Sequence, residues 1–502
     1  MTSITLGALA AELRAELHGA SDLVLRGVRH DSRQVQAGDL FVAISGQKHE
    51  GARFLPDAAA RGAVAVLSDR RLETSLPQLV VANVRWALAQ AAAQVYGDPT
   101  RRLRSLGITG TNGKTTTSWM IDAILRASGA QTALVGTVQT RLPQEERAAA
   151  MTTPEADDLM RFCCRALEQG SEFLTMEVSS HALALHRVDG VHFEVGAFSN
   201  LTPDHLDFHG DMESYGRAKA RLITDLAPAH SVVNIDDPFV RRVAAEARGQ
   251  LWTCSLSGRP EAALRVLEWG ESLEEGLWAE VESPQGALTL RAPYVGRHNL
   301  ENLLLAVGSV MALGFEREAI LRALPMLPPV PGRLQRVPNT LGFSAIVDYA
   351  HTPDALARVL EALRPTTAGR LFLVFGCGGD RDRSKRPLMG EVAARDADLV
   401  IVTSDNPRSE DPESILRAIE GGMGTMPKLQ ESGWEAAERG YLCMADRRQA
   451  IARAVAALRP GDSVLVAGKG HEDYQILGSE RVPFSDTQEL AQALLARQER
   501  GA

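Results

Sequence analysis

The segment Gly107-Ile-Thr-Gly-Thr-Asn-Gly-Lys-Thr-Thr116 constrains the fold more than any other part of this sequence. An apolar stretch precedes it, and apolar residues follow it at the spacing of one helix face: Met120, Ala123, Ile124 and Ala127. A strand, a glycine-rich loop and a helix in this order place backbone N–H groups at a helix N-terminus, where they bind phosphates. The segment therefore predicts an α/β domain that binds ATP, with Lys114 at the terminal phosphates and the Thr115 hydroxyl on Mg²⁺.

This loop differs from the common phosphate-binding pattern at one position. The pattern has its leading glycine at the place where this chain has Ile108. A glycine-rich turn that only caps a helix is the alternative. Because Gly, Lys and Thr occur together, in order and in the right context, nucleotide binding is favoured over that alternative.

Two turn-forming segments divide the 502 residues into three parts. The first is Tyr96-Gly-Asp-Pro-Thr100, which follows an alanine-rich helical pattern. The second is Leu327-Pro-Pro-Val-Pro-Gly332, whose three prolines disfavour regular structure. Parts of this size are typical of single domains or small groups of them. We therefore predict three domains, over residues 1–98, 99–331 and 332–502.

Three β-rich runs in the last part are each followed by a polar or glycine-rich loop. They are Leu371–Phe375, Leu399–Thr403 and Ser463–Ala467. Continuous apolar runs of this length are typical of buried parallel strands, and such sheets bind ligands beyond the carboxyl ends of their strands. We expect the three loops to share one pocket. In the first part the run Asp39–Ile44 indicates a strand, and the topology there stays open.

Composition argues against several classes of protein. Lys and Arg number 54 against 63 Asp and Glu, and the net charge of −9 is not gathered in blocks, which disfavours a nucleic-acid binder or a basic membrane-surface protein. The five cysteines have no disulfide or zinc spacing, which favours reduced thiols. Residues 1–20 indicate a short amphipathic helix rather than a signal peptide. We expect a cytoplasmic protein without stable membrane insertion, with monomer as the default state.

The phosphate loop and six later segments resemble the Mur ligase family, in order and along nearly the whole chain. The loop Thr109-Gly-Thr-Asn-Gly-Lys-Thr115 is similar to the family's nucleotide loop, which lacks the leading glycine. The other segments are Glu177–Ala182, Asn200–Asp207, Tyr215–Lys219, Gly296–Asn302, Pro331–Arg333 and Asp348–His351. The resemblance implies a three-domain α/β architecture: a UDP-substrate domain, a central P-loop ATPase domain and a C-terminal, Rossmann-like amino-acid domain.

An ATP-dependent amide-bond ligase is what this resemblance implies. The ATP γ-phosphate would pass to the D-glutamate carboxylate of UDP-MurNAc-L-Ala-D-Glu, and an amine would then attack the acyl phosphate, in peptidoglycan precursor synthesis. The implied ATP-binding residues are Gly110, Thr111, Asn112, Gly113, Lys114, Thr115, Thr116, Asn302, Arg333 and Asp348. The implied catalytic residues are Lys114, Glu177, His205 and Lys219.

Metal binding is implied for Thr115, Glu177 and His205. A carboxylate and an imidazole suit Mg²⁺ or Mn²⁺. Taken alone, Glu177 would be a solvated or capping acid and His205 a structural histidine; their joint placement in the family pattern reverses both interpretations. Lys219 is implied to be carbamylated, because an ammonium beside a bound cation adds like charge. A surface lysine on a helix is the alternative.

The muramoyl-peptide contacts carried over are Ser32, Thr152, Thr153, Ser179 and Arg187. For Thr152 and Thr153, which precede Pro154 and Glu155, a helix N-cap with proline at the first position is an equally weighted interpretation. At Leu185 the chain departs from the family pattern, which has glutamine there. That removes one amide contact to the substrate.

The segment Asp405-Asn-Pro-Arg408 resembles the signature of the branch that adds meso-diaminopimelate. Arg408 offers a planar fork that pairs with a carboxylate, and meso-diaminopimelate has a distal carboxylate that lysine and ornithine lack. Asp405 and Asn406 would receive the ammonium or orient the arginine. An Asx-Pro turn before a helix near Asp411 is compatible with that role. The implied diaminopimelate-binding residues are Arg381, Asp405, Asn406, Pro407, Arg408, Gly468 and Glu472.

Two alternatives remain at this stage. The first is another ligase of the same fold, such as a folylpolyglutamate synthetase or an enzyme that adds L-lysine or L-ornithine. The second is a non-catalytic nucleotide-binding relative. Retention of Lys114, Thr115, Glu177, His205 and Lys219 together speaks against the second.

Overall fold

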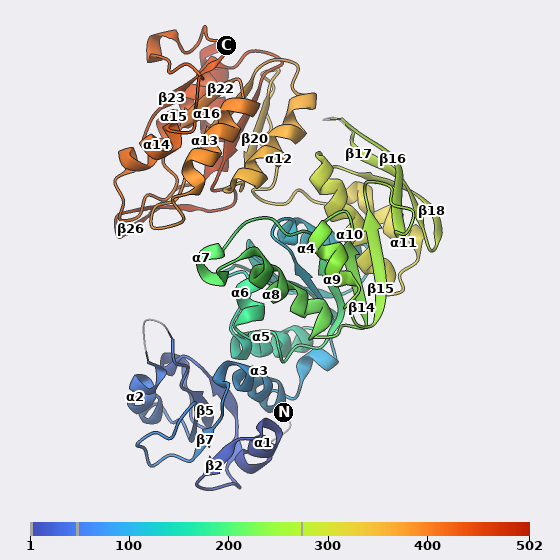
Figure 1. The fold of residues 1–502 in the computed structure, drawn as a ribbon, viewed down its shortest axis with the longest axis vertical. Coiled ribbons are helices and arrows are strands. Elements are labelled where there is room, and N and C mark those ends of the chain that lie inside the picture. Colours follow the sequence, from blue (N-terminus) through green and yellow to red (C-terminus); the bar gives the residue numbers. More distant parts are fainter. Residues whose placement is uncertain (1–3, 47–49, 273–274, 502) are drawn as a thin grey trace. The chain divides into compact units, whose positions relative to one another are not determined.

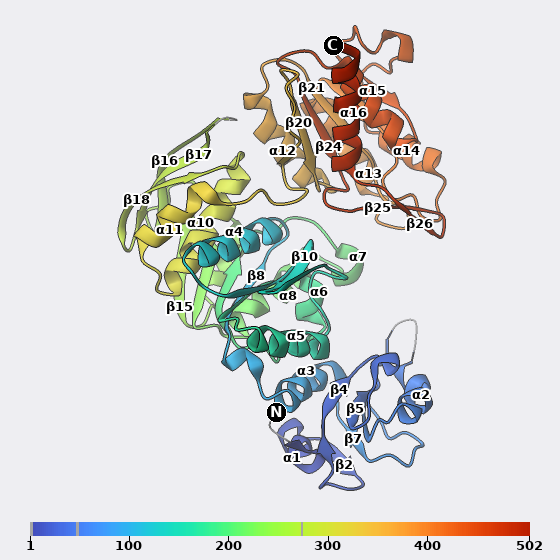
Figure 2. The same ribbon diagram turned by 180° about the vertical axis from the view of Figure 1, so that it is seen from behind.

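The computed structural model describes residues 4–46, 50–272 and 275–501 (Figures 1 and 2). The chain divides into two compact units. The first comprises residues 1–265, 283–285 and 303–323, and the second comprises residues 266–282, 286–302 and 324–502. The strand–loop–helix segment predicted to bind ATP belongs to the first unit, and the three predicted C-terminal loops belong to the second.

A five-stranded sheet forms the N-terminal part of the first unit. Its order is β2 (Glu16–His18), β7 (Gln78–Val80), β6 (Ala65–Ser68), β5 (Asp39–Val42) and β4 (Gly27–Arg29). This part also contains β1 (Ile4–Thr5), β3 (Val24–Leu25), α1 (Leu6–Leu13), α2 (Leu55–Ala60) and α3 (Val84–Val95). The strand predicted at 39–44 and the alanine-rich helix before Tyr96 are both confirmed.

The amphipathic helix expected over residues 1–20 is shorter than predicted. Helix α1 ends at Leu13, since Arg14 adopts a left-handed conformation with φ 51°. The backbone N–H of Arg14 bonds the carbonyls of Ala10 and Ala11, which satisfies the helix end. The following residues, Glu16–His18, then pair with β7 as an antiparallel edge strand. The apolar spacing of Leu6, Leu9 and Leu13 therefore predicts the helix correctly up to Leu13. Residues 16–18 form a strand instead, because they pair with β7.

The central sheet of the first unit has the order β11, β10, β9, β12, β8, β13, β14, β15. Its strands are β8 (Arg104–Thr109), β9 (Thr132–Val135), β10 (Gln139–Leu142), β11 (Glu145–Ala148), β12 (Phe173–Glu177), β13 (Phe193–Phe198), β14 (His230–Asn234) and β15 (Gln250–Ser255). The strands from β9 to β15 in this order are parallel. Their carboxyl ends therefore meet at one edge, where Thr109, Glu177 and Phe198 end three neighbouring strands.

Helices accompany these strands in the crossover connections. They are α4 (Lys114–Ala127), α5 (Ala156–Glu168), α6 (Ser180–Ala184), α7 (Leu206–His209), α8 (Met212–Thr224) and α9 (Pro238–Ala244). Helix α4 begins at Lys114, so the predicted strand–loop–helix context is confirmed by β8, the loop 110–113 and α4.

Three more strands and two helices lie between the central sheet and the C-terminal domain in sequence. They are β16 (Leu264–Ser272), β17 (Gly276–Ser283), β18 (Gly286–Ala292), α10 (Arg297–Ala312) and α11 (Arg317–Ala323). Residues 327–330 then form no helix or strand, as their prolines predict.

The C-terminal sheet in the second unit has the order β19, β20, β24, β21, β22, β23. Its strands are β19 (Gln335–Arg336), β20 (Ser344–Asp348), β21 (Leu371–Phe375), β22 (Leu399–Val402), β23 (Gly440–Cys443) and β24 (Ser463–Ala467), all parallel except β19. The three β-rich runs predicted as strands are thus β21, β22 and β24. They are neighbours, so the loops that follow them leave the same edge of the sheet.

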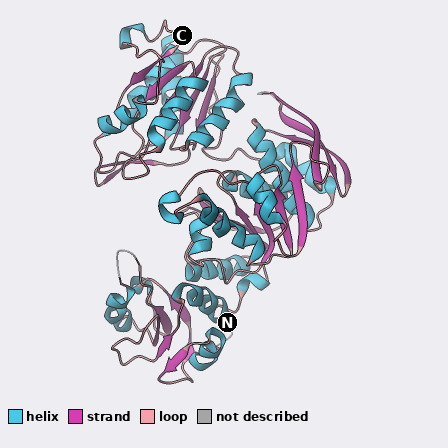
Figure 3. Ribbon diagram, viewed as in Figure 1, coloured by secondary structure: helices cyan, strands magenta, loops and turns pink. Residues whose placement is uncertain are grey.

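Alternation along β21 builds two cores, one on each face of this sheet, and Figure 3 shows the helices and strands of this domain. Leu371, Leu373 and Phe375 pack with α12 (Pro353–Leu363), α13 (Lys385–Asp396) and α14 (Pro412–Glu420). Phe372 and Val374 pack with α15 (Arg447–Ala457) and α16 (Asp486–Gly501). A sheet covered on both faces explains why its strands read as continuous apolar runs. A hairpin of β25 (Tyr474–Leu477) and β26 (Glu480–Pro483) completes the domain.

The five cysteines are free thiols. Among the described residues, no helix combines the length and apolar character needed to cross a membrane.

Candidate active site

The loop that joins β8 to α4 is held in a shape that only glycine permits at two positions. Gly110 has φ 144°, and a Cβ at this position would collide with the Ser199 hydroxyl. Gly113 has φ 88° and precedes the first residue of α4. Backbone N–H groups at a helix N-terminus bound by such a loop form an anion site. The geometry is therefore that of a phosphate cradle.

The loop that follows β13 braces this cradle from one side. Asn200 Oδ1 accepts the backbone N–H of Asn112 at 2.9 Å, and the Ser199 hydroxyl donates to the carbonyl of Asn112 at 2.6 Å. Lys114 Nζ donates to the carbonyls of Gly110 and Thr111 at 2.8 and 3.0 Å. The lysine thus folds back along the loop, so its ammonium lies where the loop's N–H groups would receive phosphate oxygens.

Glu177, the last residue of β12, is fully buried beside the start of α4. Its Oε2 accepts hydrogen bonds from the hydroxyls of Thr115 at 3.0 Å and Thr137 at 2.9 Å. Its Oε1 accepts the backbone N–H of Thr137 at 2.7 Å. A Cβ at Gly136 would press against the same oxygen at 2.5 Å. The carboxylate is therefore fixed in place, next to the hydroxyl of the first threonine after Lys114.

His205 and Lys219 both lie close to the Tyr215 ring. The His205 and Tyr215 ring centroids are 6.3 Å apart, and Lys219 Nζ lies 4.6 Å from the Tyr215 ring centroid. Tyr215 Oη in turn lies 3.2 Å from Thr111 Oγ1 in the phosphate loop. Lys219 Nζ donates to the carbonyl of Gly110 at 2.7 Å. Contacts made through α8 and the phosphate loop thus bring both predicted residues to this edge of the sheet.

Burial shifts the protonation of these side chains toward their neutral forms. Burial, with Lys114 as a second positive charge nearby, lowers the pKa of Lys219 well below its usual value. Burial lowers the pKa of His205 to about 4, against a raising effect of Asp204, so its imidazole is neutral at pH 7. His205 also has a left-handed backbone, φ 53°, a conformation that costs free energy in a non-glycine residue. A neutral imidazole is the form that ligates a metal.

The residues predicted to hold Mg²⁺ fit a hard divalent cation. Glu177 supplies a buried carboxylate and Thr115 a hydroxyl 3.0 Å from it, both oxygen donors of the kind Mg²⁺ prefers. The Glu177 carboxylate has no paired arginine among its described contacts. His205, the third residue predicted to hold the ion, lies against the rings of His181 and Tyr215.

Four of the five predicted muramoyl-peptide residues lie together near Glu177. Thr153 Oγ1 donates to the carbonyl of Glu177 at 2.9 Å, and the backbone N–H of Ser179 donates to Thr153 Oγ1 at 3.1 Å. Arg187 pairs with Glu155 at 2.8 Å and donates to the carbonyl of Thr153 at 3.2 Å. Thr152 Oγ1 lies 3.0 Å from Thr137 Oγ1.

The N-cap interpretation of Thr152 and Thr153 is wrong. Helix α5 begins at Ala156 and its N-cap position is Glu155, whose side chain makes no capping hydrogen bond. The two threonine hydroxyls instead contact Thr137, in the turn between β9 and β10, and Glu177, the last residue of β12. Leu185 follows α6 and is half-buried, with its backbone N–H bonded to the carbonyl of His181 at 2.8 Å.

Ser32, the fifth of these residues, opens a 3₁₀ turn in the N-terminal sheet domain. Two residues earlier, His30 Nδ1 lies 2.7 Å from Asp157 Oδ1 on α5. Burial lowers the pKa of His30, but the hydrogen bond and charge of Asp157 outweigh that effect and the net result is a raised pKa. The segment that holds Ser32 is thereby joined to the central sheet's helices.

In the second unit, Asp348 is hydrogen-bonded to the backbone of Leu334, the residue that follows Arg333. Asp348 ends β20, and its carboxylate accepts the N–H groups of Leu334 and Ala350, each at 2.7 Å. The Arg333 guanidinium carbon lies 4.6 Å from the Tyr349 ring centroid. Burial raises the pKa of Asp348, with Arg333 opposing the shift. Asn302 is buried on α10, where its side-chain amide bonds Asn299 at 3.3 Å.

The loops after β21, β22 and β24 pack against one another, as expected from their shared edge. Backbone touches backbone: a Cβ at Gly376 would collide with the carbonyl of Thr403, and one at Gly379 with the carbonyl of Pro407. A Cβ at Gly468 would lie 2.8 Å from Asp405 Oδ2. At Gly332 it would collide with the backbone of His471. Glycine is therefore required where these loops meet.

Among these loops, Arg408 and Asn406 each make a hydrogen bond to a neighbouring loop. Arg408, with φ 52°, donates from Nη1 to the carbonyl of Gly379 at 2.7 Å. Asn406 Nδ2 donates to Glu472 Oε2 at 3.0 Å. Arg381 is exposed, and Pro407 and Gly468 line the contacts between loops. The predicted helix near Asp411 is α14, whose N-cap Asp411 accepts the N–H groups of Glu413 and Ser414.

Several residues of these sites were missed by sequence reasoning. Thr137 and Asn200 bond the central residues of the first unit, and Lys469 and the hairpin β25–β26 hold the loops of the second. Lys469 carried a usable signal, because a lysine between two glycines after a buried strand is unusual. The others depend on contacts between distant segments.

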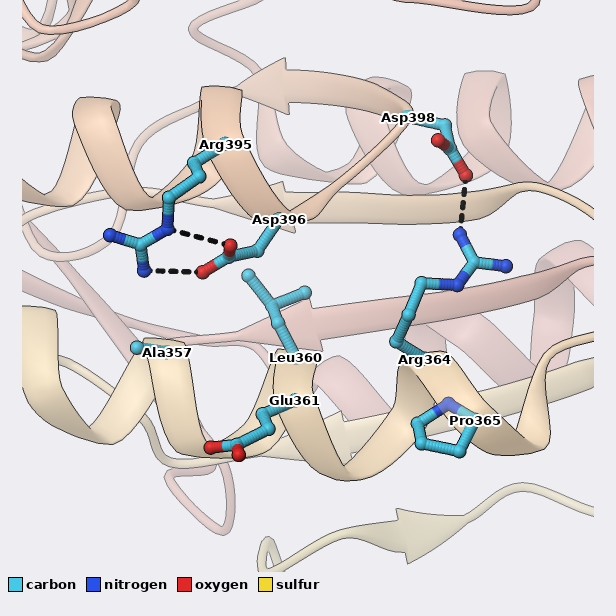
Figure 4. A pocket seen from close by; sticks show the side chains of 8 residues that line it. All are labelled: Ala357, Leu360, Glu361, Arg364, Pro365, Arg395, Asp396 and Asp398. Atoms are coloured by element: carbon cyan, nitrogen blue, oxygen red, sulfur yellow. Dashed lines mark hydrogen bonds and ion pairs between the residues drawn. The ribbon is translucent and has the colours of Figure 1, made fainter.

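A cavity of ≈ 510 Å³ in the C-terminal domain lies at the other edge of its sheet (Figure 4). The lining comes from the ends of α12 and α13 and the start of β22: Ala357, Leu360, Glu361, Arg364, Pro365, Arg395, Asp396 and Asp398. Arg364 pairs with Asp398 at 2.7 Å and Arg395 with Asp396 at 2.6 Å. The predicted binding residues follow the strands' carboxyl ends, so this cavity is not their pocket.

Comparison with known proteins assigns all three parts of the chain to one family. The models that match are the "Mur ligase family, catalytic domain" over residues 24–104, the "Mur ligase middle domain" over 108–310 and the "Mur ligase, glutamate ligase domain" over 332–470. A UDP-N-acetylmuramoyl-L-alanyl-D-glutamate–2,6-diaminopimelate ligase from Gloeobacter violaceus is 44% identical, with 100% of each chain covered.

Solved structures agree with this assignment. A structure of UDP-N-acetylmuramoyl-L-alanyl-D-glutamate–2,6-diaminopimelate ligase is 34% identical, covers 99% of this chain and 100% of its own, and has a TM-score of 0.72. A MurF ligase from Thermotoga maritima in complex with ADP is 19% identical, covers 96% of this chain and 100% of its own, and has a TM-score of 0.65, which bears on the fold alone. The three-domain α/β architecture expected from the sequence is confirmed.

Proposed function

The chain belongs to the Mur ligase family, and from that premise we propose that it is an ATP-dependent ligase that adds meso-2,6-diaminopimelate to UDP-MurNAc-L-Ala-D-Glu. In the proposed reaction an oxygen of the D-glutamate carboxylate attacks the ATP γ-phosphorus and ADP leaves. The amine of meso-diaminopimelate then attacks the acyl carbon, inorganic phosphate leaves, and the nitrogen loses a proton. The proposed domains are residues 1–98 for the UDP substrate, 99–331 for ATP and 332–502 for the amino acid, and their order is supported by the order of the three family-model matches.

One observation carries the proposal: Lys114, Thr115, Glu177, His205 and Lys219 lie around one phosphate loop, each tied to it directly or through one side chain. Both reactants are anions, so neutralising and positioning them are the main demands on the protein. Lys114 and the N–H groups of residues 110–113 would hold the phosphates. Arg187, clamped by Glu155 beside Thr153, would face the muramoyl-peptide carboxylates, assisted by Ser32, Thr152 and Ser179.

Thr115, Glu177 and His205 would hold Mg²⁺, which supplies charge neutralisation at the phosphates and at the acyl phosphate oxygens. The low pKa of Lys219 supports carbamylation, because only a neutral amine adds to carbon dioxide. In that step the Nζ–C bond forms, one proton is released, and the amine becomes a carbamate anion. Asn302, Arg333 and Asp348 are the second unit's proposed ATP contacts.

In the C-terminal domain, Arg408 and the exposed Arg381 would bind the distal carboxylate of meso-diaminopimelate. One N–H of Arg408 bonds Gly379, which fixes the plane of the guanidinium and orients its remaining donors. Asp405, Asn406 and Glu472 would receive the distal ammonium, with Pro407 and Gly468 shaping the loops. Lysine and ornithine offer Arg408 no second carboxylate.

The test is phosphate release by purified enzyme with ATP, Mg²⁺ and UDP-MurNAc-L-Ala-D-Glu, with each acceptor offered separately and the products identified by mass spectrometry. Turnover with meso-diaminopimelate alone, abolished in Arg408→Ala, is the expected result. A matched control is Arg417→Ala, an exposed arginine on α14 that pairs only with Asp411 among its described contacts. Turnover with L-lysine or L-ornithine instead would overturn the acceptor assignment, and turnover with none of them the ligase itself.

A further inference from the structure

Lys469 is a fully buried cation among the loops that follow β21, β22 and β24. These loops, proposed above to bind the amino-acid acceptor, are called the acceptor loops below. Lys469 lies between Gly468 and Gly470, both with positive φ, directly after β24. Its side chain has 0% exposure, which is rare for a lysine without paired partners. Nothing in the family resemblance or in the proposed function gives it a role.

The ammonium of Lys469 is shared among three acceptors. Nζ donates to Glu472 Oε2 at 2.9 Å and to Asn406 Oδ1 at 3.2 Å, and lies 3.8 Å from Asp405 Oδ1. Lys469 therefore contacts each of the three residues proposed to receive the acceptor's ammonium.

These contacts fix the orientation of the Asn406 amide. Its Oδ1 accepts from Lys469 and from the backbone N–H of Ile476 at 2.9 Å, while its Nδ2 donates to Glu472 at 3.0 Å. If the Asn406 amide were rotated by 180°, its Nδ2 donor would face two other donors, Lys469 Nζ and the N–H of Ile476. Glu472 is bonded through Oε2, and within the described part of the chain its Oε1 accepts no hydrogen bond, which leaves that oxygen for a ligand.

Lys469 also sets the charge of the pocket. Where the ammonium is proposed to bind, Asp405 and Glu472 contribute two negative charges and Lys469 one positive charge. Arg381 and Arg408 are the cations proposed for the distal carboxylate, and buried Arg447 beside these loops is neutralised by Asp486 at 2.7 Å. One net negative charge thus remains for a single ammonium, with the two arginines for a carboxylate, which matches a ligand end that carries one of each.

We propose that Lys469 positions Asn406 and Glu472 and, by balancing one of the two acidic charges, makes the pocket select a zwitterionic amino-acid end over a bare ammonium. This inference rests on the proposed function, since it concerns the same acceptor site. Without Lys469 the part of the pocket that receives the ammonium carries two negative charges instead of one, and it suits the singly charged end of lysine better than the zwitterionic end of meso-diaminopimelate.

The experiment compares Lys469→Met and Asn406→Asp with the wild type. The first removes the buried cation, and the second adds a carboxylate while keeping the cation, so both give the same change of pocket charge by different routes. Lys428→Met is the matched control, a lysine of the same domain that is 56% exposed and pairs with Glu420 at 2.6 Å. Thermal unfolding and ATP binding report whether each variant folds. Steady-state kcat and KM are measured for meso-diaminopimelate and for L-lysine.

We expect KM for meso-diaminopimelate to rise roughly 30-fold in Lys469→Met with kcat changed much less, the scale of losing one partner of a buried charge pair. The ratio of kcat/KM for meso-diaminopimelate to that for lysine should fall in both variants and stay unchanged in Lys428→Met. The effects of Lys469→Met and Glu472→Gln should not add, because the two residues act through one contact.

An unchanged acceptor ratio in folded Lys469→Met, or in Asn406→Asp if the first variant does not fold, overturns the inference. The same measurements separate this result from a failure of the proposed function. A wild-type enzyme that does not use meso-diaminopimelate refutes the acceptor assignment itself, whereas wild-type turnover with unaltered variants refutes only the role of Lys469.

Discussion

The Thr115 hydroxyl donates a 3.0 Å hydrogen bond to Glu177, joining the start of α4 to the end of β12. These residues are 62 positions apart in the chain, and they meet because β8 and β12 are adjacent parallel strands. The pair ties the phosphate loop to the carboxylate proposed to hold Mg²⁺. Changes at either residue should therefore affect metal binding before they affect nucleotide binding.

Glu177→Gln tests this coupling. A glutamine amide would turn an N–H₂ group toward the donors of Thr115 or Thr137. We therefore expect kcat to fall by about 100-fold or more, and the Mg²⁺ concentration that gives half-maximal activity to rise. Loss of fixed hydrogen bonds should also lower the free energy of unfolding by about 1–3 kcal/mol. The checks are Mg²⁺ titrations of activity and urea unfolding. Glu168→Gln, on the exposed end of α5, is the control, and equal effects of the two changes would contradict the proposal.

Lys219→Ala tests the proposed carbamate. Activity should fall by about 100–1,000-fold, because the site loses an anion that supports the metal. A small carboxylate such as acetate should restore part of it by occupying the vacated space. Lys114→Ala should also be inactive, but without rescue, because its lost group is a cation. Rescue of both variants, or of neither, would count against a carbamate at Lys219.

The pair of His30 and Asp157 should make stability depend on pH. The raised pKa of His30 means that its contribution is complete below pH about 6.5 and is lost as pH rises through the higher folded-state pKa. The difference in unfolding free energy between wild type and His30→Gln should therefore shrink by up to about 1 kcal/mol across that window, the ring being partly exposed. Urea unfolding between pH 5.5 and about pH 8.5 measures it.

His192→Gln is the control for this prediction, since His192 bonds Asp98 at 3.0 Å but its side chain is 46% exposed. A destabilisation by His30→Gln that is constant with pH, or that grows as pH rises, would show that the charge of His30 does not contribute.

Arg447 and Asp486 form a doubly hydrogen-bonded pair, both bonds 2.7 Å, with no solvent exposure. Arg447 also donates to the carbonyls of Ser404 and Ala467, the residues directly before Asp405 and Gly468. Asp486→Asn should lower the free energy of unfolding by about 3–5 kcal/mol, because it leaves a buried charge without its partner. The exposed pair of Arg459 and Glu438, 2.8 Å apart, is the comparison. Glu438→Gln there should cost about 1 kcal/mol or less.

Sequence patterns were sufficient for the parts of this fold that depend on local periodicity. The buried strands β21, β22 and β24 were apparent from their apolar runs, and their parallel arrangement brought the three loops together as expected. Thr152 and Thr153 show where such reasoning stops. The sequence Thr-Thr-Pro-Glu fits a helix cap locally, yet tertiary hydrogen bonds to Thr137 and Glu177 hold the hydroxyls instead.

The side chains that support the site could not be predicted from local patterns either, because they too act through tertiary contacts. Thr137 contacts Glu177 from the turn between β9 and β10, and Ile476 fixes Asn406 from a hairpin 70 residues later. Neither residue type is distinctive, so no signal marks it in one sequence. Lys469 is the exception, because its chemistry is unusual for a buried position.

The glycine contacts among the C-terminal loops bear on how acceptor choice could change. Gly376 and Gly379 let peptide groups rest directly on one another, so at these contacts between the loops there is no side chain that substitution could enlarge or shrink. Selectivity is left to the few side chains that project from these loops, among them Arg408, Asn406 and Glu472. A redesigned acceptor pocket would accordingly need new loop-tip side chains on an unaltered main chain, rather than a new loop shape.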